Sequence, residues 1–293
     1  MSGSRFRRIG GRGDNPSTVD ELIRYDRPDI ILLNDGRPIL VIEKTREVPT
    51  GHNVGQRMAR LVRAVEMGVP TIYYFPFDAR KHGKHTSICN LNIRIVSAFF
   101  NMARIHNTPA LAINWPSTTN GELIVDGSED ERVKTVVEDY LGTENPWCPE
   151  VRNQMKLMED EYDARLRRYP EYGSPPSSVE MLGTSRLCRS PELASAPPTF
   201  ASRTETVVYT IGMTPEKCRR EDPYTGTQFI YDYLWCRNGP RVADKKRNLV
   251  LKFPLIDEEI WHRCNPDDDG RKSCNWYLTA NCLWFRNGAV FLR

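Results

Sequence analysis

Two acidic residues stand at the ends of neighbouring apolar segments, and their type and spacing suit the binding of a divalent cation. In RPDIILLNDGRPILVIEKT, residues 27–45, Asp29 opens the first apolar run and Glu43 closes the second. Two carboxylates about 4 Å apart repel by roughly 4 kcal/mol at an effective dielectric near 20, and a hard cation such as Mg²⁺ reverses that repulsion. A magnesium site is therefore the simplest function for the pair.

The pairing of these acids depends on the turn between the two segments, because side chains alternate between the faces of a strand. A two-residue loop at Asp35-Gly36 would place Asp29 and Glu43 on opposite faces. A three-residue loop that also includes Asn34 would place both on one face, since Asp29 would lie diagonal to Glu43. Asn, Asp and Gly are the residues that such a loop prefers, so we predict the three-residue loop and a shared face.

A structural alternative requires no metal. Asp29 would cap the end of its strand, and Glu43 would form an ion pair with Arg46 or Arg57. The sequence leaves this alternative open.

The surrounding segments predict an α/β domain. Residues 15–25 have helical spacing after a Ser-Thr cap, 28–35 and 38–45 form strands, 52–68 form a helix that ends at a glycine, and 70–77 form a third strand. Further helices are expected at 91–107, 128–142 and 149–169, with a strand at 109–116. The order in the first part is helix, strand, strand, helix, strand.

These residues resemble the PD-(D/E)xK nuclease superfamily, also called restriction-endonuclease-like. The resemblance is carried by Pro28-Asp29, by Glu43-Lys44-Thr45 at the end of the next strand, and by the element order, and it covers roughly residues 16–78. It implies a restriction-endonuclease-like core, in which a mixed central sheet is flanked by helices. A smaller α+β module would follow at the C-terminal end.

The resemblance also implies an activity, which is Mg²⁺-dependent hydrolysis of phosphodiester bonds in double-stranded DNA. Asp29 and Glu43 would hold the metal together with the backbone carbonyl of Lys44, and Gln56 resembles a glutamine that some members carry near the metal. A type II restriction endonuclease is the expectation. A repair or resolvase-type nuclease, or a noncatalytic nucleic-acid-binding protein on the same scaffold, remain alternatives.

One motif position departs from the family pattern. The family's lysine lies two residues beyond the glutamate, where this chain has Thr45, which cannot serve as a cation. A bulge near Glu43 would bring Lys44 to the site, and we take Lys44 as the replacement. Alternatives are Arg57 or Arg60 from the following helix, or a metal-bound water that needs no lysine.

Basic residues recur along that helix. Arg57, Arg60 and Arg63 have helical spacing and are expected to contact DNA phosphates. The N-terminal segment also contains four arginines, at positions 5, 7, 8 and 12, which read as a basic arm. The formal net charge of +3 is too small to indicate nucleic-acid binding on its own.

Composition divides the 293 residues into three parts. Residues 1–170 are expected to form the nuclease domain, 171–203 a Pro/Ser-rich linker, and 204–293 a C-terminal module that could recognise DNA. Neither a membrane span nor an apolar secretory core is visible, so we expect a soluble cytoplasmic protein. Cuts on both strands would favour a homodimer.

Two features of the C-terminal module have alternative interpretations. His262 and Cys264, together with the cysteines at 274 and 282, could hold zinc, although their spacing matches no common finger. The aromatic residues Trp284 and Phe285, beside Arg286, could stack on bases, although aromatic residues at such spacing are more often part of a core.

Overall fold

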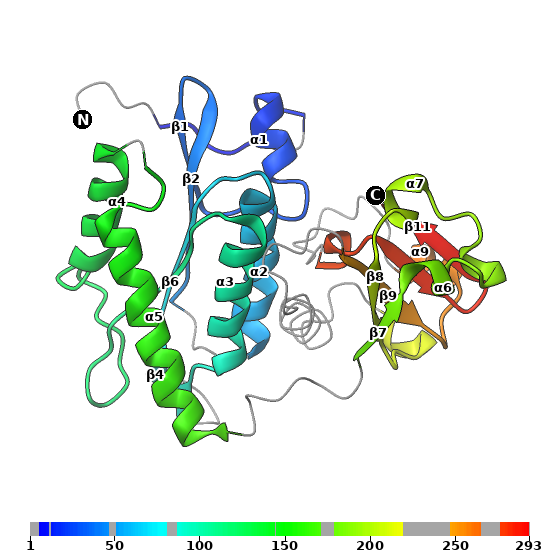
Figure 1. Ribbon diagram of the computed structural model, residues 1–293. Coiled ribbons are helices and arrows are strands. Elements are labelled where there is room, and N and C mark those ends of the chain that lie inside the picture. The colour runs from blue at the N-terminus through cyan, green and yellow to red at the C-terminus, as the bar shows by residue number, and fades with distance from the viewer. Residues whose placement is uncertain are drawn as a thin grey trace.

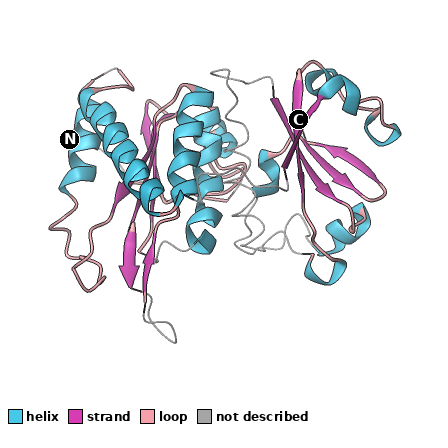
Figure 2. Cartoon of the chain, turned by 60° about the horizontal axis from the view of Figure 1, so that its bottom comes forward, coloured by secondary structure: helices cyan, strands magenta, loops and turns pink. Residues whose placement is uncertain are grey.

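The structure is a computed structural model that describes residues 6–11, 13–46, 51–80, 87–143, 145–170, 179–218, 247–264 and 276–292. For residues 51–56, 217 and 276 it describes the backbone and not the side chain. These residues form a four-stranded, a five-stranded and a two-stranded sheet, with helices beside the larger two (Figures 1 and 2). Every helix in these ranges is too short or too polar to cross a lipid bilayer.

The four-stranded sheet forms where apolar residues run almost without interruption. Its strands and adjoining helices are α1 (Ser17–Leu22), β1 (Ile30–Asn34), β2 (Arg37–Lys44), α2 (Gly51–Glu66), β3 (Thr71–Phe75) and β6 (Ala110–Asn114). The strand order is β1-β2-β3-β6, with β1 antiparallel to β2 and the other pairs parallel. All residues of β3 are buried, as in a strand that is covered on both faces. The predicted α/β class and element order are confirmed.

Three more helices complete this part of the chain. They are α3 (Ile93–His106), α4 (Glu131–Gly142) and α5 (Pro149–Arg168), and the short strands β4 (Asp78–Arg80) and β5 (Ile88–Asn90) pair with each other. In Figure 1, α2 and α3 lie together on one side of the sheet, with α4 and α5 on the other side of the strands. Gln154 of α5 donates to the carbonyl of Ala112 at 2.8 Å, so α5 satisfies part of the outer edge of β6.

The hairpin turn differs from the prediction. Asn34 pairs with Arg37, so the loop contains only Asp35 and Gly36, both with positive φ, 49° and 76°. This two-residue turn is the kind that matches the twist of the flanking strands. Local composition suited either loop, and the strand twist selects the shorter one.

A β-bulge follows the turn and changes the register of the hairpin. Leu33 pairs with Pro38 whereas Leu32 pairs with Leu40, so Ile39 is an extra residue on β2. The carbonyl of Ile39 accepts a hydrogen bond of 2.7 Å from the hydroxyl of Tyr140 on α4. The bulge is therefore secured by a helix about a hundred residues further along the chain.

The five-stranded sheet lies in the C-terminal part. Its strands are β7 (Val179–Gly183), β8 (Glu205–Thr210), β9 (Arg247–Phe253), β10 (Cys282–Phe285) and β11 (Gly288–Phe291). They are ordered β11-β10-β9-β8-β7, with the inner three parallel and the two edge strands antiparallel to their neighbours. Short helical segments adjoin them, namely α6 (Thr184–Leu187), η2 (Pro191–Leu193), α7 (Pro198–Ala201), η3 (Pro215–Lys217), α9 (Glu258–Cys264) and η4 (Trp276–Thr279).

Within the segment predicted as a linker, 171–203, the described residues 179–203 contribute one strand to this sheet and short helical segments that pack beside it. Residues 171–178 lie outside the described part, but β7 pairs with β8 along its whole length. Leu187, Leu193 and Phe200 then form a small core against the sheet. Proline and serine dominate the composition of the segment, and its few apolar residues are too widely spaced to produce a period, so the sequence pattern concealed these elements.

Most of the described aromatic residues of the C-terminal part belong to the core. Phe285 and Tyr277 are buried, and Trp284 is half-buried with the Lys252 ammonium 4.1 Å from its ring centre. Arg286 pairs with Asp257. Helix α2 also contacts η4, and buried residues of both parts join one apolar cluster. Tyr277 and Phe285 therefore contribute to the core, which is the more common role of aromatic residues at such spacing.

The turn provides a test of the hairpin geometry. Gly36→Ala is expected to lower the free energy of unfolding by about 1–2 kcal/mol, because Gly36 has a left-handed φ that a Cβ disfavours. Space is not the cause, since a Cβ there would meet no atom within 4 Å. Gly142→Ala at the end of α4 is the control and should be neutral or slightly stabilising. Urea unfolding measures both, and equal losses would contradict the assignment of strain to the turn.

Candidate active site

The bulge brings Asp29 and Glu43 together. Ile30 pairs with Ile42, so extending the ladder by one residue places Asp29 level with Glu43, on the same face. Two hydrogen bonds join the positions: the Asp29 backbone N–H donates to Glu43 Oε2 at 3.1 Å, and the Lys44 N–H donates to Asp29 Oδ2 at 2.9 Å. The predicted shared face is thus present, but the bulge produces it and not a three-residue loop.

The Glu43 carboxylate is enclosed and paired with arginines. Its side chain is 0% exposed, under α2. The Arg60 Nη1 lies 2.7 Å from Glu43 Oε1, and the Arg57 Nη1 lies 3.2 Å from the same oxygen. The ion pair between Glu43 and Arg57, which the sequence left open, is therefore formed. It coexists with the proximity to Asp29.

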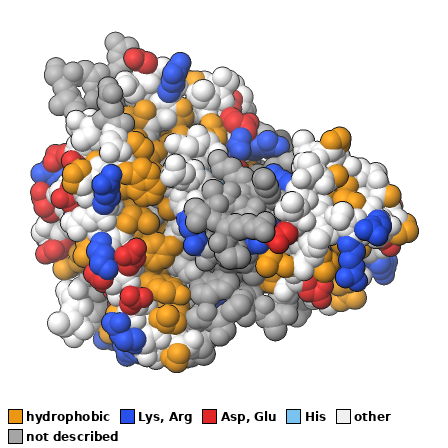
Figure 3. Space-filling model, viewed as in Figure 1, with side chains coloured by type: hydrophobic (Ala, Val, Ile, Leu, Met, Phe, Trp, Pro, Cys, Tyr) orange, Lys and Arg blue, Asp and Glu red, His pale blue; other side chains and the backbone are white. Residues whose placement is uncertain are grey.

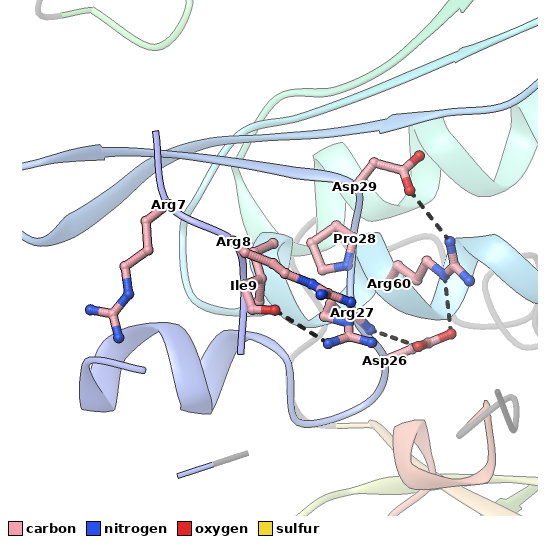
Figure 4. A pocket seen from close by; sticks show the side chains of 8 residues that line it. All are labelled: Arg7, Arg8, Ile9, Asp26, Arg27, Pro28, Asp29 and Arg60. Carbon is pink, nitrogen blue, oxygen red and sulfur yellow. Dashed lines mark hydrogen bonds and ion pairs between the residues drawn. The ribbon is translucent and has the colours of Figure 1, made fainter. Parts of the chain in front are cut away.

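Arg60 is the common partner of the acids at this end of the sheet. Its Nη1 lies 4.0 Å from Asp29 Oδ1 in addition to the contact with Glu43, and its Nε donates to Asp26 Oδ2 at 3.1 Å (Figure 4). Burial opposes the charge of the guanidinium, but Asp26 and Glu43 raise its pKa, so Arg60 is cationic. One arginine thus supplies the positive charge that the pair of acids requires.

Burial also shifts the protonation of Glu43. Loss of water around the carboxylate raises its pKa to about 7, while Arg60 lowers it, Asp29 raises it and Arg57 lowers it. Burial outweighs both ion pairs. Near neutral pH this residue is therefore poised between the acid and the carboxylate, and a cation added at the site would favour the carboxylate.

Lys44 occupies the other face of the sheet. Its Nζ lies 3.9 Å from Asp130 Oδ2 and 4.4 Å from the centre of the Trp115 ring. The β2–β3 register is continuous from Val41 to Lys44, and the bulge lies at Ile39, so no irregularity beside Glu43 turns Lys44 toward the acids. The expected replacement of the motif lysine by Lys44 therefore does not fit. Arg60, one of the alternatives, is in reach of both acids.

Thr45 and Arg63, two other residues of the predicted site, make their described contacts away from the two acids. Thr45 is buried, and its N–H donates to the Tyr74 carbonyl at 3.0 Å. Arg63 pairs with Glu21 and, at 3.1 Å, with Glu66, away from Asp29 and Glu43. The side chain of Gln56 lies outside the described part of the structure.

The arginines of α2, which the sequence predicts to contact DNA phosphates, are largely turned away from solvent. The side chains of Arg57, Arg60 and Arg63 are only 23%, 16% and 19% exposed, because each reaches back to carboxylates of the sheet or of α1. Helical spacing correctly places them on one face of α2. That face is the inner one.

An open cavity of about 360 Å³ adjoins the acids. It is lined by Arg7, Arg8, Ile9, Asp26, Arg27, Pro28, Asp29 and Arg60 (Figure 4). Asp26 and Arg27 were missed by the sequence reasoning, although the run Asp26-Arg27-Pro28-Asp29 is contiguous with the motif and could have indicated them. The face of the molecule in Figure 3 shows Lys and Arg singly or in small groups over its described surface, without a continuous basic area.

The donors suit a hard cation in chemical type. Asp29 and Glu43 are adjacent oxygen ligands, and the Asp29 side chain is 40% exposed beside the cavity. Within the described ranges, no group of three or more His, Cys, Asp or Glu side chains is arranged to hold a metal. The protein would thus have two carboxylates for Mg²⁺, and Glu43 Oε1 would have to be released from its arginines.

The predicted zinc alternative falls partly outside the described residues, because Cys274 is not described. Cys264 is exposed, whereas Cys282 is buried in the sheet. Burial raises the pKa of the Cys282 thiol to about 12, which disfavours the thiolate that zinc requires.

Comparison of the chain with models of protein families, with curated proteins and with solved structures found no match.

Glu43 generates a prediction about pH. Its pKa is raised from 4.5 to about 7 in the folded protein, so the folded state binds the proton more tightly than the unfolded chain does. Stability from this group is fully present below pH 4.5 and is lost as the pH rises to about 7. The loss should be about 3 kcal/mol, since one pKa unit corresponds to about 1.4 kcal/mol.

The measurement is urea unfolding across this pH window in EDTA, for the wild type and for Glu43→Gln. The unfolding free energy of the wild type minus that of Glu43→Gln should fall as the pH rises, because only the wild type loses the contribution of Glu43. Glu180→Gln, at an exposed position of β7, is the control and should follow the wild type. A difference that stays constant with pH would show that Glu43 has an ordinary pKa.

Proposed function

We propose that this protein is a Mg²⁺-dependent DNA endonuclease with a restriction-endonuclease-like core. The observation that carries the proposal is the juxtaposition of Asp29 and Glu43 at the end of the β1–β2 hairpin, beside an arginine-lined cavity. The element order, with α1 before the hairpin and α2 between β2 and β3, supports the same conclusion. These features support the proposal beyond the sequence motif alone.

The roles of the residues follow from their positions. Asp29 and Glu43, with the carbonyl of Lys44, would hold Mg²⁺, which when bound polarises a phosphodiester and lowers the pKa of a water. Arg60 takes the part of the motif lysine, because its guanidinium already lies between the two acids. A guanidinium can donate two parallel hydrogen bonds to phosphate oxygens, which would orient the scissile group and offset its charge.

The substrate class follows from charge. The arginines around the cavity suit the phosphates of nucleic acid. The family resemblance favours double-stranded DNA and, within it, a type II restriction endonuclease acting as a homodimer inside the cell. A repair or resolvase-type nuclease would use the same chemistry with another specificity.

One observation favours a second function, a noncatalytic nucleic-acid-binding protein on a nuclease scaffold. Glu43 is fully enclosed, and its Oε1 contacts two arginines. If these ion pairs do not yield to Mg²⁺, the acids only position arginines, and the site is structural. The two functions differ in their response to the metal.

Cleavage of DNA tests the proposal directly. The wild-type chain with Mg²⁺ is expected to cut plasmid DNA, and Asp29→Asn or Glu43→Gln should slow cutting by about 100-fold or more, as loss of one electrostatic group at a reacting centre commonly does. Glu180→Gln is the matched acid control and should cut normally. Sequencing of the ends separates site-specific from general cleavage. Equal cutting by all variants, or none by the wild type, would remove the nuclease assignment.

The role of Arg60 can be separated from metal binding. Arg60→Gln should bind Mg²⁺ about tenfold more tightly, equivalent to about 1.4 kcal/mol, because the guanidinium no longer holds Glu43 Oε1. The same variant should lose cleavage. Mg²⁺ affinity is measured by the rise in melting temperature with metal concentration.

Arg63→Gln is the control for that experiment, since Arg63 lies one turn further along α2 and pairs with other acids. Its Mg²⁺ affinity should equal that of the wild type. If neither the wild type nor Arg60→Gln responds to Mg²⁺, the metal-dependent nuclease assignment fails and the noncatalytic alternative is favoured.

A further inference from the structure

The cavity beside the acids has a charge imbalance that the proposed reaction does not use. Of the four arginines in its wall, only Arg60 has carboxylate partners among the described contacts. Asp26 is occupied on both oxygens, by the Nε of Arg60 and by the backbone N–H of Arg27. The rim arginines Arg7, Arg8 and Arg27 therefore form no ion pair with an acid of the described chain, although Asp26 and Asp29 belong to the same wall.

The contacts of the rim arginines are to neutral groups. Arg27 Nη1 donates to the carbonyls of Ile9 and Gly10 at 3.4 and 3.3 Å, and Arg7 Nη2 donates to the carbonyl of Asp14 at 3.1 Å. Arg8 has no hydrogen bond or ion pair within the described part of the chain. Figure 4 shows the Arg8 side chain extending toward Arg27, with Arg60 beyond it, while Arg7 points away.

Two neighbouring guanidinium groups repel each other, and an anion between them removes that repulsion. Arg27 is anchored by the carbonyls of Ile9 and Gly10, so the backbone that carries Arg8 is held beside the Arg27 side chain. Both are exposed and open to a ligand. The arrangement thus has the properties of an anion site.

The lining indicates which part of a nucleic acid would enter. Among the described lining residues, the apolar members are Ile9 and Pro28, and none has an aromatic side chain on which a base could stack. Guanidinium groups recognise phosphate through paired hydrogen bonds. The ligand class is therefore a backbone phosphate and not a base, and the contact carries no sequence information.

We propose that Arg8 and Arg27 bind a phosphate of the DNA strand next to the one cleaved at Asp29 and Glu43. Asp29 belongs to the wall of the same cavity, so the two phosphates would be close neighbours on one strand. This inference rests on the proposed function for the position of the phosphate. The binding itself does not require cleavage.

The experiment measures DNA binding without catalysis. Affinity of the full chain for a short labelled duplex is determined by fluorescence anisotropy in EDTA, over a series of KCl concentrations. Each phosphate contact contributes about 0.9 to the slope of log affinity against log salt concentration. Arg8→Gln is expected to lower the slope by about one and to weaken binding to duplexes of unrelated sequence alike.

Arg27→Gln should have the same effect, and the double variant should lose no more than one contact, because both residues bind one phosphate. Arg152→Gln, at an exposed position on α5, is the matched control and should leave the slope unchanged. Arg8→Gln tests binding without disturbing the fold, because the Arg8 side chain makes no hydrogen bond or ion pair in the described part of the chain that the substitution would remove. Circular dichroism checks that each variant is folded.

A second arm compares duplexes with 5′-phosphate and 5′-hydroxyl ends. Equal affinities are expected for an internal phosphate, and dependence on the terminal phosphate would overturn that assignment. An unchanged salt slope in Arg8→Gln and Arg27→Gln would overturn the site itself. If these variants weaken binding while the wild type fails to cut with Mg²⁺, the phosphate site stands and the nuclease proposal fails.

Discussion

The proximity of the buried Glu43 carboxylate to the partly exposed Asp29 carboxylate is the constraint on which this end of the molecule depends. Asp29 and Glu43 are linked through backbone hydrogen bonds at the base of a hairpin, where burial alone already disfavours the ionised Glu43. A nearby cation or protonation of Glu43 must compensate such an arrangement. The chain provides that cation from α2, and the position of the helix against the sheet is in turn tied to the acids through Arg57 and Arg60. Electrostatics and packing therefore support the same interface.

The same charge compensation is expected in a structural ion-pair network and in a catalytic site. An arginine between two acids is what a structural ion-pair network would contain, and it is also what a phosphodiesterase without its motif lysine would need. Two features go beyond what a structural ion-pair network requires. The Asp29 side chain is partly exposed beside the cavity, and further arginines line that cavity.

Much of the first sheet could be predicted from the sequence, because runs such as ILVIE and TIYYF are apolar enough to specify buried strands. The sequence predicted that the two acids share a face, but it did not predict the bulge that brings them together. An extra residue in a ladder leaves no local signature in the run PILVIE, since Ile39 is as apolar as its neighbours, and its bonding partner Tyr140 lies far along the chain. The sequence also could not show that the Arg60 side chain turns toward the acids. Helical spacing defines which residues share a face, whereas tertiary packing decides what that face contacts. Elements within 179–203 were missed because their contacts are long-range.

The bulge at Ile39 has a consequence for the motions of the hairpin. The ladder consists of two short stretches that are out of register by one residue. Tyr140 donates a hydrogen bond to the bulged residue Ile39 between them. Fraying that begins at the exposed tip can therefore spread to the joint without displacing the base, since the second stretch keeps its own hydrogen bonds. Local opening of the tip would therefore leave the two acids in place, and the contact with α4 would limit how far the opening extends.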